Sequence, residues 1–253
     1  MKIIGFFGKG GTGKTTLTAL ILRELVSRGQ GDILAVDADP NECLASLLDA
    51  EGSPSIADML DKYKQQKAQS PEMTGIEVFQ RLFDTLLMEG EQDGYDMVVM
   101  GRGEGEGCYC AINDLLQSVF RTTIDAEFYK YILMDCEAGV EHIARKTSRR
   151  INDAIIVTDA SKVSLDTLKR IKDVATEVKA DIQNYYVVAN RTKPEMEARV
   201  KEATEKLGFK YLGAIPHDEK FADLAYEGKS IFELPDDSAA VQAVKKMVDE
   251  LQG

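Results

Sequence analysis

Short apolar runs recur along the chain, separated by longer segments in which apolar residues return with helical spacing. The runs are almost continuously apolar, which is the pattern of strands buried on both faces of a parallel sheet. They predict strands at residues 2–7, 33–36, 97–100, 132–134, 154–157, 185–189 and 211–214. The polar stretch 62–74 predicts an exposed helix or a mobile loop.

Three apolar stripes between the runs predict amphipathic helices, the first of which Gly29 is expected to end. The stripes consist of Leu17, Leu20, Ile21 and Leu25, of Ile76, Phe79, Phe83 and Leu86, and of Val241, Val244, Val248 and Leu251. Strands and helices alternate over the whole length, and no repeat or interdomain linker interrupts them. The pattern predicts a single α/β domain over residues 1–253, with a mostly parallel central sheet and helices on both faces.

Composition narrows the function classes. The 253 residues are 44% hydrophobic and 29% charged, which is ordinary for a globular protein. The formal net charge of −12 opposes binding to phosphate backbones, so we expect no nucleic-acid partner. No apolar run reaches 18 residues and no targeting segment is evident, so we expect a cytoplasmic protein with no membrane contact.

The first predicted strand leads into the P-loop pattern G-x-x-x-x-G-K-[ST]. The residues are Gly8, Lys9, Gly10, Gly11, Thr12, Gly13, Lys14, Thr15 and Thr16. The glycines allow backbone N–H groups to surround phosphate oxygens, Lys14 neutralises the β and γ phosphates, and the Thr15 hydroxyl can ligate Mg²⁺. A glycine turn without a ligand is the alternative, but a strand before the loop and a helix after it favour a nucleotide site.

Aspartates follow two other predicted strands. Residues 131–135 form an apolar strand that ends in Asp135, the Walker B pattern, so we expect Asp135 to hold Mg²⁺ through water. Asp37 and Asp39 belong to the sequence D-A-D-P after the second strand, where carboxylates are placed to handle Mg²⁺ and water. Without the P-loop, this quartet would equally suit a helix-capping turn.

The residues that would contact the base favour adenine. Guanine-reading GTPases carry N-K-x-D, whose aspartate accepts from guanine, whereas this chain reads Asn190, Arg191, Thr192, Lys193. The acceptor is missing, so we expect ATP as the nucleotide and Asn190 as a base contact.

Lys9 directly after the first glycine gives K-G-G-x-G-K-[ST]-[ST], which resembles the deviant Walker A motif of the MinD-like dimeric ATPases. The resemblance implies a homodimer in which Lys9 reaches the partner's nucleotide, so that Lys9 and Lys14 both act in catalysis. It also implies that Asp39 orients the attacking water, with Asp37 near the magnesium shell.

The same resemblance extends to two further segments. Cys136-Glu137-Ala138-Gly139 looks like switch II, where the Gly139 N–H senses the γ-phosphate. Residues 215–218 resemble the second base-side loop of the family, which implies nucleotide contacts for Pro216 and Asp218.

A cysteine pair lies in a glycine-rich segment that reads G-R-G-E-G-E-G-C-Y-C. On an extended chain Cys108 and Cys110 point to the same side, so their thiolates can address one metal ion. A two-fold axis through the segment would supply four thiolates, a closed set for nickel or zinc. Zinc would favour the tetrahedral form, and nickel could impose square-planar geometry. A glycine-rich connection with two chance cysteines, or a transient disulfide, are the alternatives.

The P-loop and the Gly107-Cys108-Tyr109-Cys110 quartet together resemble the CooC-type nickel-insertion ATPases, which mature carbon monoxide dehydrogenase or acetyl-CoA synthase. The resemblance covers essentially the whole chain. It implies an ATP-dependent metallochaperone whose client is a nickel–iron–sulfur enzyme. The physiological metal and the client enzyme stay open, since thiolates accept zinc, nickel and Cu(I).

Three other functions remain. An electron-donating ATPase like the nitrogenase iron protein would hold a [4Fe–4S] cluster between its subunits. A MinD or partition-type positioning ATPase would need a membrane or DNA contact, and an iron–sulfur scaffold ATPase would share the P-loop. We expect Cys43 and Cys136 to belong to packing, and His142 and His217 to be surface or loop residues.

Overall fold

The computed structural model of the protein describes residues 1–39, 41–69, 78, 81–82, 84–87, 91–101, 128–136 and 151–252. The strands are β1 (Lys2–Phe7), β2 (Ile33–Asp37), β3 (Glu91–Gln92), β4 (Tyr95–Val99), β5 (Tyr131–Asp135), β6 (Ile151–Thr158), β7 (Ile182–Asn190) and β8 (Lys210–Ile215). The helices are α1 (Lys14–Ser27), α2 (Cys43–Leu47), α3 (Ile56–Gln69), α7 (Lys162–Glu177), α8 (Pro194–Lys206), α9 (Glu219–Glu227) and α10 (Ala239–Gln252), with a 3₁₀ turn η1 (Ile231–Glu233). Each of the predicted strands is present, with ends that differ by a few residues.

The strands form one sheet in the order β3-β4-β2-β5-β1-β6-β7-β8. All neighbours from β4 to β8 pair in parallel, and β3 pairs antiparallel with β4 at one edge. The prediction of a mostly parallel central sheet is therefore confirmed. The two polar residues of β3 have no apolar signal, which explains why the sequence did not predict this strand.

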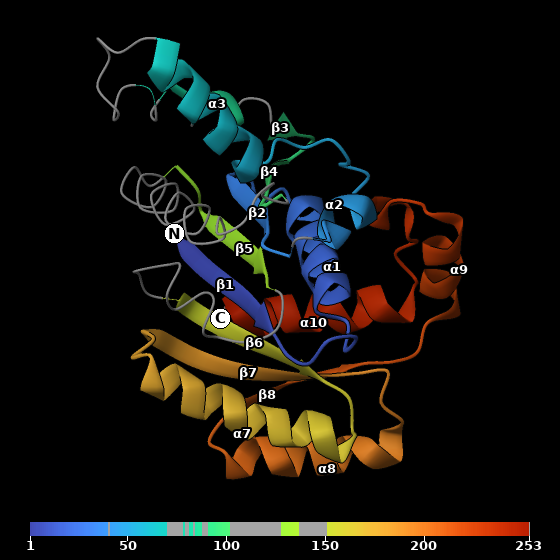
Figure 1. The fold of residues 1–253 in the computed structure, drawn as a ribbon. Helices are drawn as coiled ribbons and strands as arrows, with labels where there is room; N and C mark the ends of the chain where they lie inside the picture. The colour runs from blue at the N-terminus through green and yellow to red at the C-terminus, as the bar shows by residue number, and fades with distance from the viewer. Residues whose placement is uncertain are drawn as a thin grey trace.

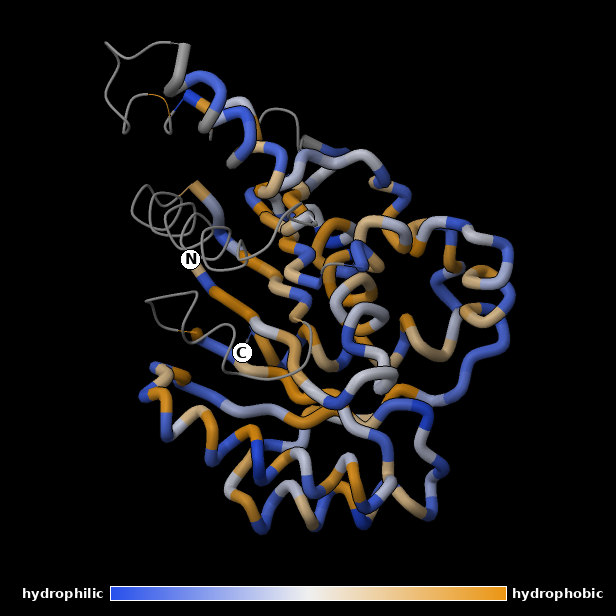
Figure 2. The backbone as a smooth tube through the Cα atoms, viewed as in Figure 1, coloured by the Kyte–Doolittle hydropathy of each residue, from blue (hydrophilic) through white to orange (hydrophobic). Residues whose placement is uncertain are grey.

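Successive side chains of each strand enter two separate cores. On β1, Ile3 and Phe7 pack into the core on one face, whereas Ile4 and Phe6 pack into the core on the other. Helices α3, α7 and α8 supply apolar residues to the first core, and α1, α2 and α10 supply them to the second. Figure 1 shows α7 with α8 and α1 with α10 on opposite sides of the sheet, and Figure 2 shows the strongly hydrophobic strands between them.

The predicted helices are confirmed where the structure describes them. The first stripe lies in α1, whose end is followed by Gly29 with φ 67°, and the Gly29 N–H donates to Val26 O at 2.8 Å. The third stripe is buried in α10. Residues 62–69 of the polar stretch belong to α3. Of the second stripe Leu86 is buried, while Ile76, Phe79 and Phe83 lie outside the described residues.

Parallel pairing brings the predicted site residues to one edge of the sheet. The P-loop follows β1, Asp37 ends β2, Asp135 ends β5 and Asn190 ends β7. In open α/β sheets ligands bind at this carboxyl edge, where the strand order reverses on either side of β1.

Candidate functional site

The loop between β1 and α1 follows a path that requires glycine at two points. Gly8 has φ 138° and Gly13 has φ 97°, conformations that L side chains rarely adopt. A Cβ on Gly8 would lie 2.3 Å from Val157 O, and a Cβ on Gly13 would lie 2.1 Å from Asn190 Nδ2. At both positions a side chain would clash with a neighbouring atom, and the backbone of the turn also favours glycine.

The amino end of α1 is left open for an anion. Gly13 precedes the helix without a side-chain cap, and its first turn holds no acidic residue. The unpaired N–H groups and the helix dipole favour phosphate there. Lys14 is 9% exposed, and its Nζ lies 3.5 Å from Lys9 O, a weak contact that a phosphate oxygen would replace.

Asp135 is the carboxylate that fits a magnesium role best. It is 1% exposed, and at good geometry neither oxygen has a hydrogen-bond partner among the described residues. Burial raises its pKa to about 7, against the lowering effect of the Thr15 hydroxyl beside it, and Asp37 adds to the rise. A buried carboxylate with unused lone pairs next to Thr15 suits hydrated Mg²⁺, so the residues present fit the ion.

Asp37 lies beside Asp135 in the β2–β5 register and is fully buried. Its Oδ1 accepts from the Asp39 N–H at 3.1 Å, and its Oδ2 accepts from Leu44 N at 2.8 Å and Ala45 N at 3.3 Å. Asp37 therefore anchors the start of α2, and burial raises its pKa to about 6 despite these bonds. Its place near the magnesium shell stays a prediction.

Asp39 is half-buried and lines the same cavity as the P-loop. Its Oδ1 accepts from both the backbone N–H and the side-chain amide of Asn41, each at 2.9 Å. These bonds fix the orientation of the carboxylate at the cavity wall. The water-orienting role of Asp39 stays a prediction.

The end of β7 contacts the P-loop directly. Asn190 is buried, and its Nδ2 donates to Thr12 O at 2.7 Å. The amide oxygen is the part of Asn190 that can accept from an adenine amino group. Its predicted base contact is untested.

Asp218 has a clear structural task. Its Oδ1 accepts from Phe221 N at 3.3 Å, and its Oδ2 accepts from Ser238 Oγ at 2.5 Å and Ala240 N at 2.9 Å. The carboxylate caps α9 and joins it to the start of α10. Burial raises its pKa, but these hydrogen bonds outweigh burial and lower it overall. Pro216 and His217 line the cavity beside it.

One cavity of about 560 Å³ contains most of these residues. Its walls come from the P-loop, the end of β7 and the loop between β8 and α9, with Asp39 and Cys43 opposite. A cavity of this size suits a nucleotide. The cavity therefore brings together the predicted phosphate and base contacts, while Asp135 lies buried beside Thr15.

The sequence placed Arg191 beside the predicted base contact Asn190 but gave it no role. Its Nη2 donates to Gly11 O at 2.6 Å, and it lines the cavity. The available sequence signal was its position after Asn190, where N-K-x-D has its lysine.

The cysteines divide into three cases. Cys136 is 3% exposed within the core, which confirms its packing role. The same expectation was wrong for Cys43, which is exposed at the start of α2, where the short helix turns its first residue outward. Cys108, Cys110, Gly139 and His142 lie outside the described residues. Within the described part of the chain, no three His, Cys, Asp or Glu side chains gather as a metal site.

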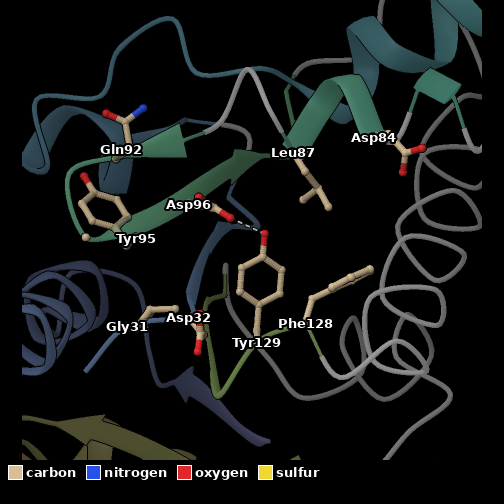
Figure 3. A pocket seen from close by; sticks show the side chains of 11 residues that line it. Gly31, Asp32, Asp84, Leu87, Gln92, Tyr95, Asp96, Phe128 and Tyr129 are labelled. Atoms are coloured by element: carbon tan, nitrogen blue, oxygen red, sulfur yellow. Dashed lines mark hydrogen bonds between the residues drawn. The ribbon is translucent and has the colours of Figure 1, made fainter. Parts of the chain in front are cut away.

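A second cavity, of about 550 Å³, lies at the opposite edge of the sheet, where β2, β4 and β5 begin. Figure 3 shows Tyr129 pointing toward Asp96, to which its hydroxyl donates. Asp32 and Asp84 also line this cavity. Carboxylates repel phosphate, so this cavity does not suit the nucleotide.

Comparison with known proteins decides the family. A model of the CobQ/CobB/MinD/ParA nucleotide binding domain matches residues 3–231. The chain belongs to this family. With its complete P-loop, this family member is an ATPase that takes Mg²⁺ with its nucleotide.

Relatives resemble the chain over nearly their whole length. An uncharacterised ATP-binding protein of Methanocaldococcus jannaschii is 34% identical, covering 98% of each chain. The carbon monoxide dehydrogenase accessory protein CooC of Rhodospirillum rubrum is 26% identical, over 91% of this chain and 89% of its own. MinD in the MinC–MinD cell division complex of Aquifex aeolicus shares the fold, with a TM-score of 0.74 and 23% identity. The match covers 100% of this chain and 96% of the MinD chain. Among the described helices, none has the length and apolar character needed to cross a bilayer.

Proposed function

We propose that this ATPase works as a homodimer that couples ATP hydrolysis to delivery of a metal ion, nickel, into a nickel–iron–sulfur enzyme such as carbon monoxide dehydrogenase. The observation that carries the proposal is the conjunction of a complete ATP site with the Cys108–Cys110 pair. The CooC relative, named as a carbon monoxide dehydrogenase accessory protein, supports the choice of client. The cytoplasmic location stays a prediction.

The nucleotide half of the proposal rests on geometry. The open amino end of α1 and the buried side chains of Lys14 and Asp135 support a pre-arranged site for a triphosphate and its cation. Hydrolysis transfers the γ-phosphoryl group to water, so the bond to the β-phosphate oxygen breaks and ADP leaves. In this proposal Asp39 orients the water, and Mg²⁺ would lower the charge on the phosphates.

The dimer half rests on Lys9. Its side chain is exposed on the P-loop, whereas Lys14 of the same loop is buried. An exposed cation beside a phosphate site is free to reach the nucleotide of a second copy. Formation of the dimer would bring two Cys108–Cys110 pairs together, and four thiolates make a closed site for one ion.

Anaerobic analytical ultracentrifugation with nickel, with and without MgATP, tests the proposal when bound metal is counted in the same samples. We expect one nickel ion per dimer in the wild-type protein. The double variant Cys108→Ser/Cys110→Ser should lose that ion and still bind ATP. Cys43→Ser is the matched control, because it removes an exposed thiol and should keep the metal.

Other results would point to the alternatives. Nickel that persists in the double variant would overturn the shared thiolate site. A brown protein with four irons per dimer would indicate the electron-donating class instead. An ATP-dependent dimer that holds no metal would contradict metal delivery and favour a positioning ATPase.

The last helix disfavours membrane positioning. The apolar residues of α10, among them Val244, Val248 and Leu251, are buried in the core that α10 shares with α1. A helix that binds a membrane surface must present its apolar face to lipid. We therefore expect no sedimentation with anionic liposomes.

A further inference from the structure

Arg191 joins three parts of the nucleotide site. It follows β7, and its backbone N–H donates to Ile215 O, at the end of β8, at 2.9 Å. Its guanidinium donates through Nη2 to Gly11 O in the P-loop at 2.6 Å. The base-side loop that begins after Ile215 and the P-loop are therefore tied to one residue.

Arg191 and Asn190 act on consecutive carbonyls of the P-loop. Arg191 binds Gly11 O, and Asn190 binds Thr12 O at 2.7 Å. In a trans peptide the C=O and the next N–H point in opposite directions. Fixing these two carbonyls therefore fixes the directions of the Thr12 and Gly13 N–H groups.

The Thr12 N–H shows the effect of this arrangement. It donates to Lys9 O at 3.3 Å, and Thr12 Oγ1 donates to the same oxygen at 2.8 Å. These bonds close the turn from Lys9 to Thr12, while Arg191 holds Gly11 O from the other side. The guanidinium thus stabilises the phosphate-binding turn.

The backbone of Arg191 supports a specific task. It has φ 53°, in the left-handed region that is unfavourable for residues with a Cβ. A glycine would adopt this conformation without strain. Such conformations persist where surroundings enforce them, and here both the backbone N–H and the side chain are bound.

We propose that Arg191 is a positioning residue of the nucleotide site, which holds the P-loop in its phosphate-binding shape through Gly11 O and ties it to the base-side loop. The ligand it serves is the polyphosphate of an adenine nucleotide. The proposal depends on ATP binding alone, so its test is independent of nickel delivery.

The test compares Arg191→Ala, Arg191→Lys and Arg191→Gly in the full chain by steady-state ATP hydrolysis and equilibrium ATP binding. Loss of a charge-assisted hydrogen bond predicts about tenfold weaker binding of ATP in Arg191→Ala. Arg191→Lys should recover most of the affinity, because its ammonium can also donate to Gly11 O. Arg191→Gly relieves the backbone but lacks the donor, so it should bind ATP as weakly as Arg191→Ala.

Competition by inorganic pyrophosphate separates positioning from base contact. If Arg191 shapes the P-loop, pyrophosphate inhibition weakens about tenfold in Arg191→Ala, in parallel with ATP binding. Unchanged pyrophosphate inhibition with weaker ATP binding would assign Arg191 to the base and overturn the proposal. Wild-type ATP affinity in Arg191→Gly would overturn it as well.

Lys179 provides the matched control. It has φ 53°, as Arg191 does, and lies after the end of α7, away from the cavity lining. Lys179→Ala therefore removes a cation at a left-handed position without touching the P-loop. It should leave both ATP and pyrophosphate binding at wild-type values.

Discussion

At the scale of single residues, the buried carboxylate of Asp135 is the clearest link between stability and function. Burial favours the neutral form of this acid by more than the Thr15 hydroxyl favours the charged form, so its pKa rises from 3.8 to about 7. The unfolded chain releases this proton near pH 4, whereas the folded protein keeps it until about pH 7. Folded stability therefore falls as the pH rises between these values, by at most about 4 kcal/mol.

Asp135→Asn should remove this pH dependence. In the absence of Mg²⁺ and nucleotide, the variant should unfold at a higher urea concentration than wild type at pH 8, because asparagine carries no charge to bury. Near pH 4 the two proteins should differ little. Urea unfolding at both pH values measures the stability. A separate assay of MgATP hydrolysis should show a rate at least about 100-fold lower than that of the wild type.

Equal stability of the two proteins at pH 8 would show that neighbouring groups already offset the cost of burying the charged Asp135 carboxylate. Hydrolysis at the wild-type rate would remove Asp135 from the magnesium site. Asp173→Asn is the control, since Asp173 is an exposed carboxylate on α7, and this variant should keep both the stability and the hydrolysis rate of the wild type.

Asp39 belongs to the same scale and makes a different prediction. It lines the cavity without belonging to the phosphate-binding loop, so Asp39→Ala should leave the ATP dissociation constant within about threefold of wild type. If it orients water, the turnover number should fall about 100-fold or more. Equilibrium binding and single-turnover hydrolysis separate the two effects, and an unchanged turnover number would exclude the role.

At the scale of elements, the sequence predicted the helices and strands whose apolar residues follow a regular local pattern. Strands buried on both faces are continuously apolar, so the parallel strands among the described residues could all be predicted, including those that end at Asp37 and Asp135. The P-loop was visible because its spacing is fixed by local backbone geometry. The contact of Arg191 with the P-loop could not be predicted, because it depends on a left-handed backbone and on Gly11, which is distant in sequence.

The loop after β8 shows the same limit of sequence reasoning. Family resemblance gave Asp218 a nucleotide contact, but its carboxylate is occupied by α9 and the start of α10. Helix-capping partners that lie about 20 residues downstream leave no pattern in the local sequence. The resemblance thus points to a loop that lines the cavity, but it does not show that the Asp218 carboxylate caps a helix.

Asp218→Ala should accordingly destabilise the protein rather than change its nucleotide preference. Loss of a carboxylate that accepts from Phe221 N, Ser238 Oγ and Ala240 N should cost about 1–3 kcal/mol in the free energy of unfolding. The ratio of ATP to GTP affinity should stay at the wild-type value. Urea unfolding and competition binding are the measurements, and a changed ratio with unchanged stability would instead assign Asp218 a contact with the base.

At the scale of the whole molecule, the charge of −12 works against the proposed dimer. Two copies repel each other at long range, so association requires local attraction that is strong enough to overcome this repulsion. In the proposed dimer, exposed Lys9 beside a bound triphosphate would provide such attraction, since the phosphate charges would lie close to the contact. ATP would then act as part of the interface, and ADP, which has less charge, should hold the dimer less well.

Lys9→Ala tests this interface directly. In an Asp39→Ala background that preserves ATP, sedimentation should show a dimer with Lys9 intact and a monomer with Lys9→Ala, while both proteins still bind ATP through Lys14. Lys201→Ala, an exposed lysine on α8, changes the net charge by the same amount and should leave the dimer intact. If both lysine variants weaken the dimer equally, net charge rather than a specific contact controls association. If neither does, Lys9 has no role at the interface, and the four-thiolate site would need another means of bringing two chains together.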